Sequence, residues 1–60
     1  MWTVIFVTDE IGVAKNMKQS LENLSVKVRV KKRVSKNNEP STYEVLVPEA
    51  EVSVALGQIS

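Results

Sequence analysis

The chain has 60 residues, and its eight basic and seven acidic side chains give a formal net charge of +1, with no cysteine and no histidine. A single small domain is expected, because a chain of this length buries only about 60% of the surface that its unfolded form exposes. The missing cysteine and histidine exclude a disulfide framework and the usual structural metal sites, so association with a second copy is the expected stabilising device. A reducing cytoplasm suits a chain without cysteine, and no apolar run reaches the roughly 20 residues that span a membrane.

The segment Trp2–Thr8 predicts the first strand, since it has no charged residue and is rich in β-branched and aromatic side chains. Strict alternation places Val4 and Phe6 on one face of this strand. It places Ile5 and Val7 on the other face, which is equally apolar. The pattern does not decide which of the two faces meets the helices.

An amphipathic helix is predicted over about residues 9–24. Asp9 and Glu10 stand at its start, where the helix dipole favours negative charge. Apolar side chains then recur at spacings of three and four, and the residues of this stripe are Ile11, Ala14, Met17, Leu21 and Leu24. Such spacing predicts that the helix packs on the sheet through one face.

The most regular pattern lies at residues 26–34, VKVRVKKRV, where valines alternate with basic residues. This period of two predicts a strand with one buried and one charged face. The polar stretch 35–41 predicts a hairpin loop, and Thr42–Val47 predicts the third strand. Pro48 ends that strand and opens a short second helix, whose inward side chains are expected to be Val52, Ala55, Leu56 and Ile59.

The predicted order is therefore β-α-β-β-α, an α+β fold. A right-handed crossover through the first helix sets the first two strands parallel, with the third strand between them and antiparallel to both. The expected sheet order is 2-3-1 with two helices on one face, a truncated ferredoxin-like fold that lacks its last strand. One side of the first strand is then an unpaired edge, which another chain can pair with.

The open face of this sheet is expected to have a basic half and an apolar half. If the valines of residues 26–34 face the helices, the bases Lys27, Arg29 and Lys31 lie on the open face. Glu44 is then placed to pair with one of them, and Leu46 shares the face. An apolar patch on a small protein favours a protein interface, although scattered exposed apolar residues are the alternative. The interface hypothesis is a homodimer built on Trp2, Val4, Phe6 and Leu46.

Catalysis is not expected from the inventory of side chains. The two glycines form no phosphate loop, the serines have no histidine base, and the seven carboxylates are dispersed along the chain. No general acid–base pair or nucleophile can be recognised. We therefore expect no enzymatic activity, no cofactor and no metal.

The basic residues suggest an alternative function, because six of the eight fall between residues 27 and 36. They offer a nucleic-acid or anion-binding surface on Lys27, Arg29, Lys31 and Arg33. The near-neutral net charge and the lack of an aromatic RNA-binding motif count against it. A solvated strand that keeps the sheet surface soluble, or a surface for an acidic protein, would explain the same bases.

The segments KQSLENLSVKVRVK and TYEVLVPEAEVSVA are similar to a bacterial family of small domains of unknown function, described as prokaryotic signal-transducing proteins. Val47–Glu49 matches the family's strand-to-helix junction and Lys18–Glu22 matches its first helix. Members often carry a glycine after this helix, where the present chain has Asn23–Ser25. The family is classed near PII-type regulatory proteins, so the resemblance implies a ferredoxin-like sheet and a regulatory role, with no site residues to carry over. We therefore expect a non-enzymatic cytoplasmic interaction or regulatory module that forms a homodimer.

Overall fold

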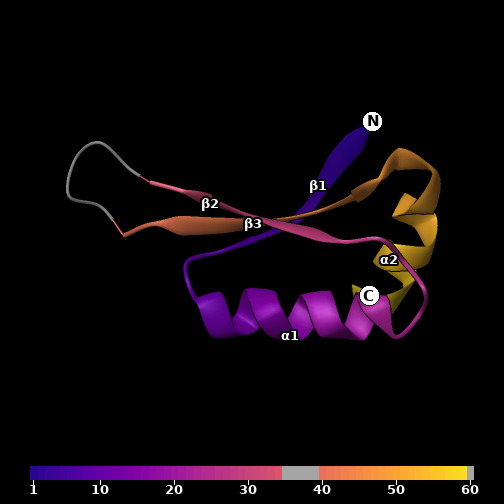
Figure 1. The fold of residues 1–60 in the computed structure, drawn as a ribbon, viewed down its shortest axis with the longest axis horizontal. Coiled ribbons are helices and arrows are strands. Elements are labelled where there is room, and N and C mark those ends of the chain that lie inside the picture. The colour runs from indigo at the N-terminus through magenta and orange to yellow at the C-terminus, as the bar shows by residue number, and fades with distance from the viewer. Residues whose placement is uncertain (35–39, 60) are drawn as a thin grey trace.

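A computed structural model describes residues 1–34 and 40–59, without the side chains of residues 58 and 59. Its elements follow the predicted order (Figure 1), and they are β1 Trp2–Thr8, α1 Ile11–Glu22, β2 Arg29–Arg33, β3 Thr42–Pro48, a 3₁₀ turn Glu49–Glu51 and α2 Val52–Ile59. The sheet order is β1-β3-β2, and β3 is antiparallel to both neighbours. The predicted α+β fold and sheet order are confirmed. Most of the hairpin loop expected at 35–41 lies outside the described residues.

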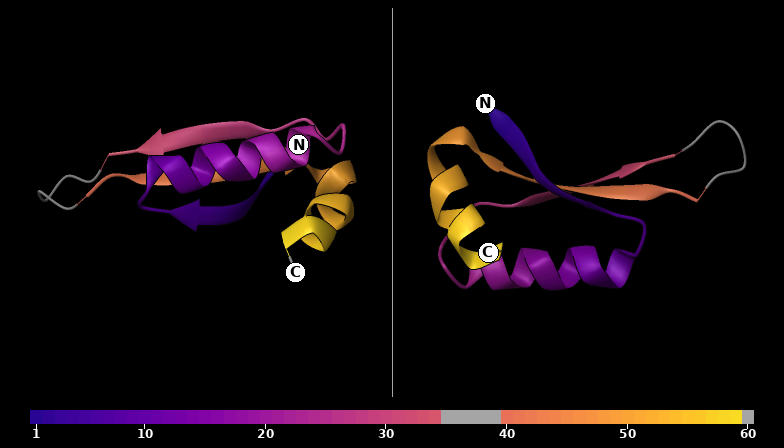
Figure 2. Two further views of the ribbon diagram at one scale, coloured as in Figure 1. Left: turned by 90° about the horizontal axis from the view of Figure 1, so that it is seen from below. Right: turned by 180° about the vertical axis from the view of Figure 1, so that it is seen from behind.

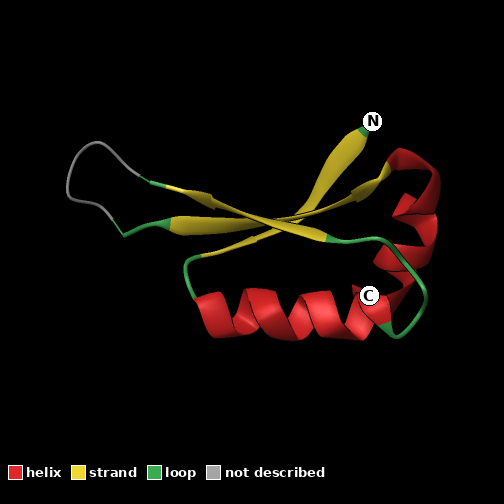
Figure 3. Ribbon diagram, viewed as in Figure 1, coloured by secondary structure: helices red, strands yellow, loops and turns green. Residues whose placement is uncertain are grey.

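Both helices lie on one side of the sheet, as Figures 2 and 3 show. Helix α1 lies beneath the sheet and runs roughly along its strands, and α2 descends from the end of β3 toward the C-terminal end of α1 (Figures 1 and 2). We call the opposite side the open face, because no helix in the described part of the chain covers it. The hairpin of β2 and β3 extends past the N-terminal end of α1 (Figure 1).

The buried core is small and centres on β3. Its buried side chains come from both helices, from β3 and from the turn before β2, and they are Ala14, Leu21, Val26, Val45, Val47 and Ala55. Met17 and Val52 pack against this cluster, which confirms part of the predicted inward face of each helix. Both faces are shorter than expected, because Ile11 and Leu24 of α1 and Leu56 of α2 are exposed. The side chain of Ile59, the last residue predicted to face inward, lies outside the described part of the chain.

Strand β1 contains a bulge that the sequence pattern did not predict. Val4 pairs with Leu46, yet Phe6 pairs with Val45, so one extra residue, Ile5, is inserted between them. A bulge of this kind shifts the alternation of side chains by one position. Ile5 and Phe6 therefore both pack against the core.

Val4 and Val7 consequently lie on the side of β1 away from the helices, together with Trp2. Neither alternation expected from the sequence was right, since one put Val4 with Phe6 on a face and the other put Ile5 with Val7. The physical reason is burial, because the bulge lets two large adjacent side chains, Ile5 and Phe6, both leave water.

Helix α1 ends in a turn that leads the chain toward β2. The backbone N–H of Val26 donates to the carbonyl oxygen of Leu21 (3.2 Å), and the N–H of Ser25 donates to that of Glu22 (2.9 Å). This pair of bonds is the pattern of a Schellman motif, which needs a left-handed residue. Ser25 takes that conformation, with φ of 63°. Residues 26–28 complete this connection, so β2 begins at Arg29 rather than at the predicted Val26.

Replacing Ser25 by glycine is expected to stabilise the fold by about 0.5–1 kcal/mol, because glycine adopts a positive φ without the steric cost of a Cβ atom. Urea denaturation followed by circular dichroism measures the change. Gln19→Gly, at an exposed position inside α1, is the matched control and should destabilise by about 1 kcal/mol. Equal destabilisation by both glycines would contradict the left-handed turn.

Candidate functional site

The open face is the candidate site, and its residues are fixed by the register of the three strands. We call Trp2, Val4, Val7 and Leu46 the apolar half of this face. We call Arg29, Lys31 and Arg33 the basic half. The two halves lie side by side because β1 and β2 flank β3 on opposite sides.

The apolar half extends from β1 to the middle of the sheet. Val4 is 42% exposed and Val7 is 53% exposed, whereas Trp2 and Leu46 are half-buried. Leu46 pairs with Val4 on one side and with Arg29 on the other, so it marks the boundary between the halves. Exposed valines on a strand leave apolar area in water that a partner surface can cover.

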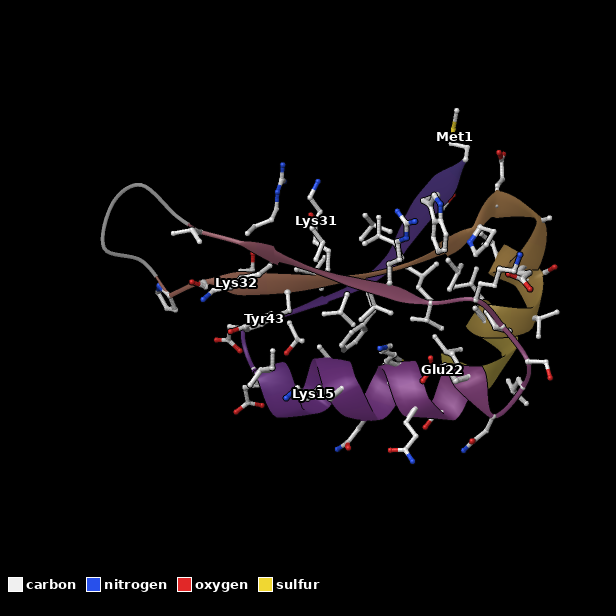
Figure 4. All side chains as sticks on the ribbon, viewed as in Figure 1. Met1, Lys15, Glu22, Lys31, Lys32 and Tyr43 are labelled. Atoms are coloured by element: carbon white, nitrogen blue, oxygen red, sulfur yellow. The ribbon has the colours of Figure 1, made fainter. Side chains whose placement is uncertain are left out.

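The basic half consists of alternate residues of β2, which all point away from the helices. Lys31 illustrates this orientation, since its side chain projects away from α1. The side chain of Tyr43, on the neighbouring strand, points toward α1 (Figure 4). Lys31 is also the register partner of Glu44. The predicted alternation of residues 26–34 is therefore confirmed within β2.

The ion pair of Glu44 differs from the expected one. Its Oε2 atom lies 3.5 Å from Nη1 of Arg33, whereas the sequence indicated Lys27, Arg29 or Lys31 as the partner. Arg33 is diagonal to Glu44 in the ladder, and long side chains reach across that distance. Because the Arg33 side chain is 66% exposed, the pair contributes little to stability.

A contact between Trp2 and Arg29 joins the two halves across β3. The Arg29 guanidinium carbon lies 4.5 Å from the centroid of the Trp2 ring, within the range of a cation–π interaction. The contact holds the planar guanidinium against the indole. Residues 27 positions apart in the chain meet here only because β3 separates their strands.

A hollow of about 620 Å³ adjoins this contact. It is lined by side chains or backbone of Trp2, Lys18, Val28, Arg29, Val30, Lys31 and Leu46. The lining thus carries three cationic residues and one indole and no carboxylate. Lys18 comes from α1 on the helix side, whereas Arg29 and Lys31 point to the open face, so the hollow extends around the outer edge of β2. No pattern in the sequence predicted that Lys18 lies near the basic residues of β2.

Two residues named in the sequence hypotheses lie apart from this site. Phe6 faces the core on the helix side of the sheet. Lys27 precedes β2, and its backbone N–H donates to Oε2 of Glu51 (3.3 Å). The structure therefore brings together Trp2, Val4 and Leu46 of the interface hypothesis, and Arg29, Lys31 and Arg33 of the anion hypothesis.

Two further findings concern the described residues as a whole. No three acidic side chains among them are grouped in a way that could hold a metal ion. None of their helices is both long enough and apolar enough to cross a membrane.

The Trp2–Arg29 contact is expected to show a coupling of about 0.5–1 kcal/mol in a double-mutant cycle, because the ring attracts the cation held over it. The cycle uses Trp2→Leu, Arg29→Gln and the double variant, with unfolding followed by circular dichroism. Trp2→Leu with Lys31→Gln is the control pair and should be additive within about 0.5 kcal/mol. Equal coupling in both cycles would show that the cation–π contact has no specific effect.

Comparison with family models, curated proteins and solved structures finds no match to this chain.

Proposed function

We propose that the protein is a non-enzymatic interaction module of a regulatory kind, which self-associates through β1 and the apolar half of the open face. The observation that carries the proposal is the pair of exposed valines, Val4 and Val7, on an uncharged strand at the sheet edge. A second copy of the chain is the proposed occupant of this surface.

The two outer strands of the sheet differ in a way that supports this choice. Strand β2 has four basic residues among its five, and such charges on an edge discourage pairing with another chain. Strand β1 has no charged residue over its whole length. Since neither outer edge pairs with another strand in the described part of the chain, β1 is the edge open to association.

The apolar half offers a small contact. Only Val4 and Val7 among its residues are exposed, while Trp2 and Leu46 are half-buried. Such a contact is smaller than a standard interface of about 800 Å² per partner. We therefore propose a dimer whose population depends on protein concentration.

The bulge in β1 shapes the proposed contact. It divides the strand edge into two short segments on either side of Ile5, and bulges limit continuous pairing along an edge. It also places Val4 and Val7 on the same face. Side chains of the apolar half therefore supply most of the proposed contact, and edge hydrogen bonds supply less. The regulatory role draws on the resemblance of Lys18–Glu22 and Val47–Glu49 to signal-transducing domains.

Val7→Lys is expected to shift the dimer toward monomer, because the substitution puts a charge into the apolar contact. The variant should still fold, since Val7 pairs with Glu44 in the ladder and a lysine there gains an opposite charge across the strands. Light scattering after size-exclusion chromatography, over a range of protein concentrations, measures the mass.

Val54→Lys is the matched control, because Val54 is 52% exposed but lies on α2. It should leave the concentration dependence of the mass unchanged. A wild-type chain that stays monomeric at every concentration would refute self-association. A dimer weakened only by Val54→Lys would move the interface to α2.

A further inference from the structure

We infer that the hollow beside Arg29 is a binding site for single-stranded nucleic acid, with a base stacked against the Trp2–Arg29 pair and phosphates near Lys18 and Lys31. This site spans the start of β1 and the length of β2, because Trp2 lies on β1 and Arg29 and Lys31 lie on β2. The inference does not rest on self-association, and because Trp2 and Leu46 belong to both surfaces, a single strand and a second copy of the chain would compete for them.

The charges around the hollow point to an anion. Lys18, Arg29 and Lys31 line it, and none of them has a carboxylate within ion-pair distance among the described residues. Glu44, the register partner of Lys31, forms its ion pair with Arg33. Arg29 and Lys31 are two residues apart on one strand, which separates them by about 6.8 Å along its axis. This arrangement suits a ligand with more than one negative group.

The planar groups point to a flat ring in the ligand. The guanidinium of Arg29 lies over the indole of Trp2 at 4.5 Å, and both residues line the hollow. Unpaired bases stack on arginine planes and on aromatic rings. The indole holds the guanidinium in one orientation, which reduces the entropy lost when a base stacks on it. A simple phosphate would leave this planar surface unused.

The balance of charge and stacking favours single strands over a duplex. Three cations and a net charge of +1 provide weak electrostatic attraction, so stacking has to supply a substantial part of the affinity. Bases in a duplex are stacked on one another and cannot enter the hollow.

The test is a titration of the intact chain into a fluorescently labelled oligothymidylate of about eight nucleotides, followed by anisotropy at several salt concentrations. A slope of log K against log salt near −2 is expected for about three phosphate contacts. Trp2 is the only tryptophan in the chain, so quenching of its fluorescence by unlabelled oligonucleotide reports stacking directly. Trp2→Leu should weaken binding about tenfold, and Trp2→Phe should weaken it less.

Two double variants with equal loss of charge locate the site. Arg29→Gln with Lys31→Gln should weaken binding at least tenfold and reduce the salt slope to about −0.7. Lys15→Gln with Lys32→Gln is the control, because Lys15 lies on α1 and Lys32 alternates to the helix side of β2. The control pair should retain most of the affinity. Circular dichroism verifies that each variant is folded.

Several results would overturn the inference. A duplex of equal length, or polyglutamate, that binds as tightly as the single strand would show that charge alone attracts the ligand. Equal losses of affinity in the two double variants would show that the basic residues of the hollow do not form a local site. Absence of binding at low salt, or binding without any quenching of Trp2, would exclude the proposed stacking.

Discussion

The whole structure depends on the burial of one side of β3 by helix α1. Leu21 of α1 and Val45 and Val47 of β3 are the largest fully buried side chains, and burial of each contributes about 1.5–3 kcal/mol. Their sum is comparable with the whole stability of a small domain. A chain of this length has only one further short helix, α2, which closes the end of the same side. The sheet is therefore covered on one side only, and its other side is available for function.

The same constraint explains the distribution of polarity on the sheet. The central strand is protected by a neighbour on each edge and by α1 below, whereas β1 and β2 have outer edges without a strand partner in the described residues. Strand β2 carries basic residues along its length, and their charges oppose pairing with another chain. Strand β1 carries none, and the bulge at Ile5 turns two valines outward together. The open face thus combines an apolar contact surface with a cationic one.

The contact between Trp2 and Arg29 orders two side chains of the open face relative to each other. It fixes a planar cation over an indole beside a hollow lined by two lysines. Protein association through the apolar half and anion binding at the hollow share Trp2 and Leu46. The two proposed surfaces therefore meet in the middle of the sheet, and a partner on one of them would cover part of the other.

Local patterns in the sequence determined the secondary structure and the topology. The alternation in residues 26–34, the helical spacing of Ala14, Met17 and Leu21, and the handedness of the crossover each depend on neighbouring residues or on general geometry. They were enough to predict β-α-β-β-α and the position of β3 between the other strands. They also placed Arg29 and Lys31 on the open face.

Only the tertiary structure decided the details of the site, because these depend on contacts between residues distant in the chain. The bulge that turns Phe6 inward follows from competition between adjacent side chains for the core. The pairing of Glu44 with Arg33 depends on side-chain reach across the ladder. The approach of Lys18 to β2 and of Trp2 to Arg29 depends on how α1 and β1 lie relative to β2. A period of two or of 3.6 assigns a residue to a face, but it contains no information about which distant side chain that residue meets there.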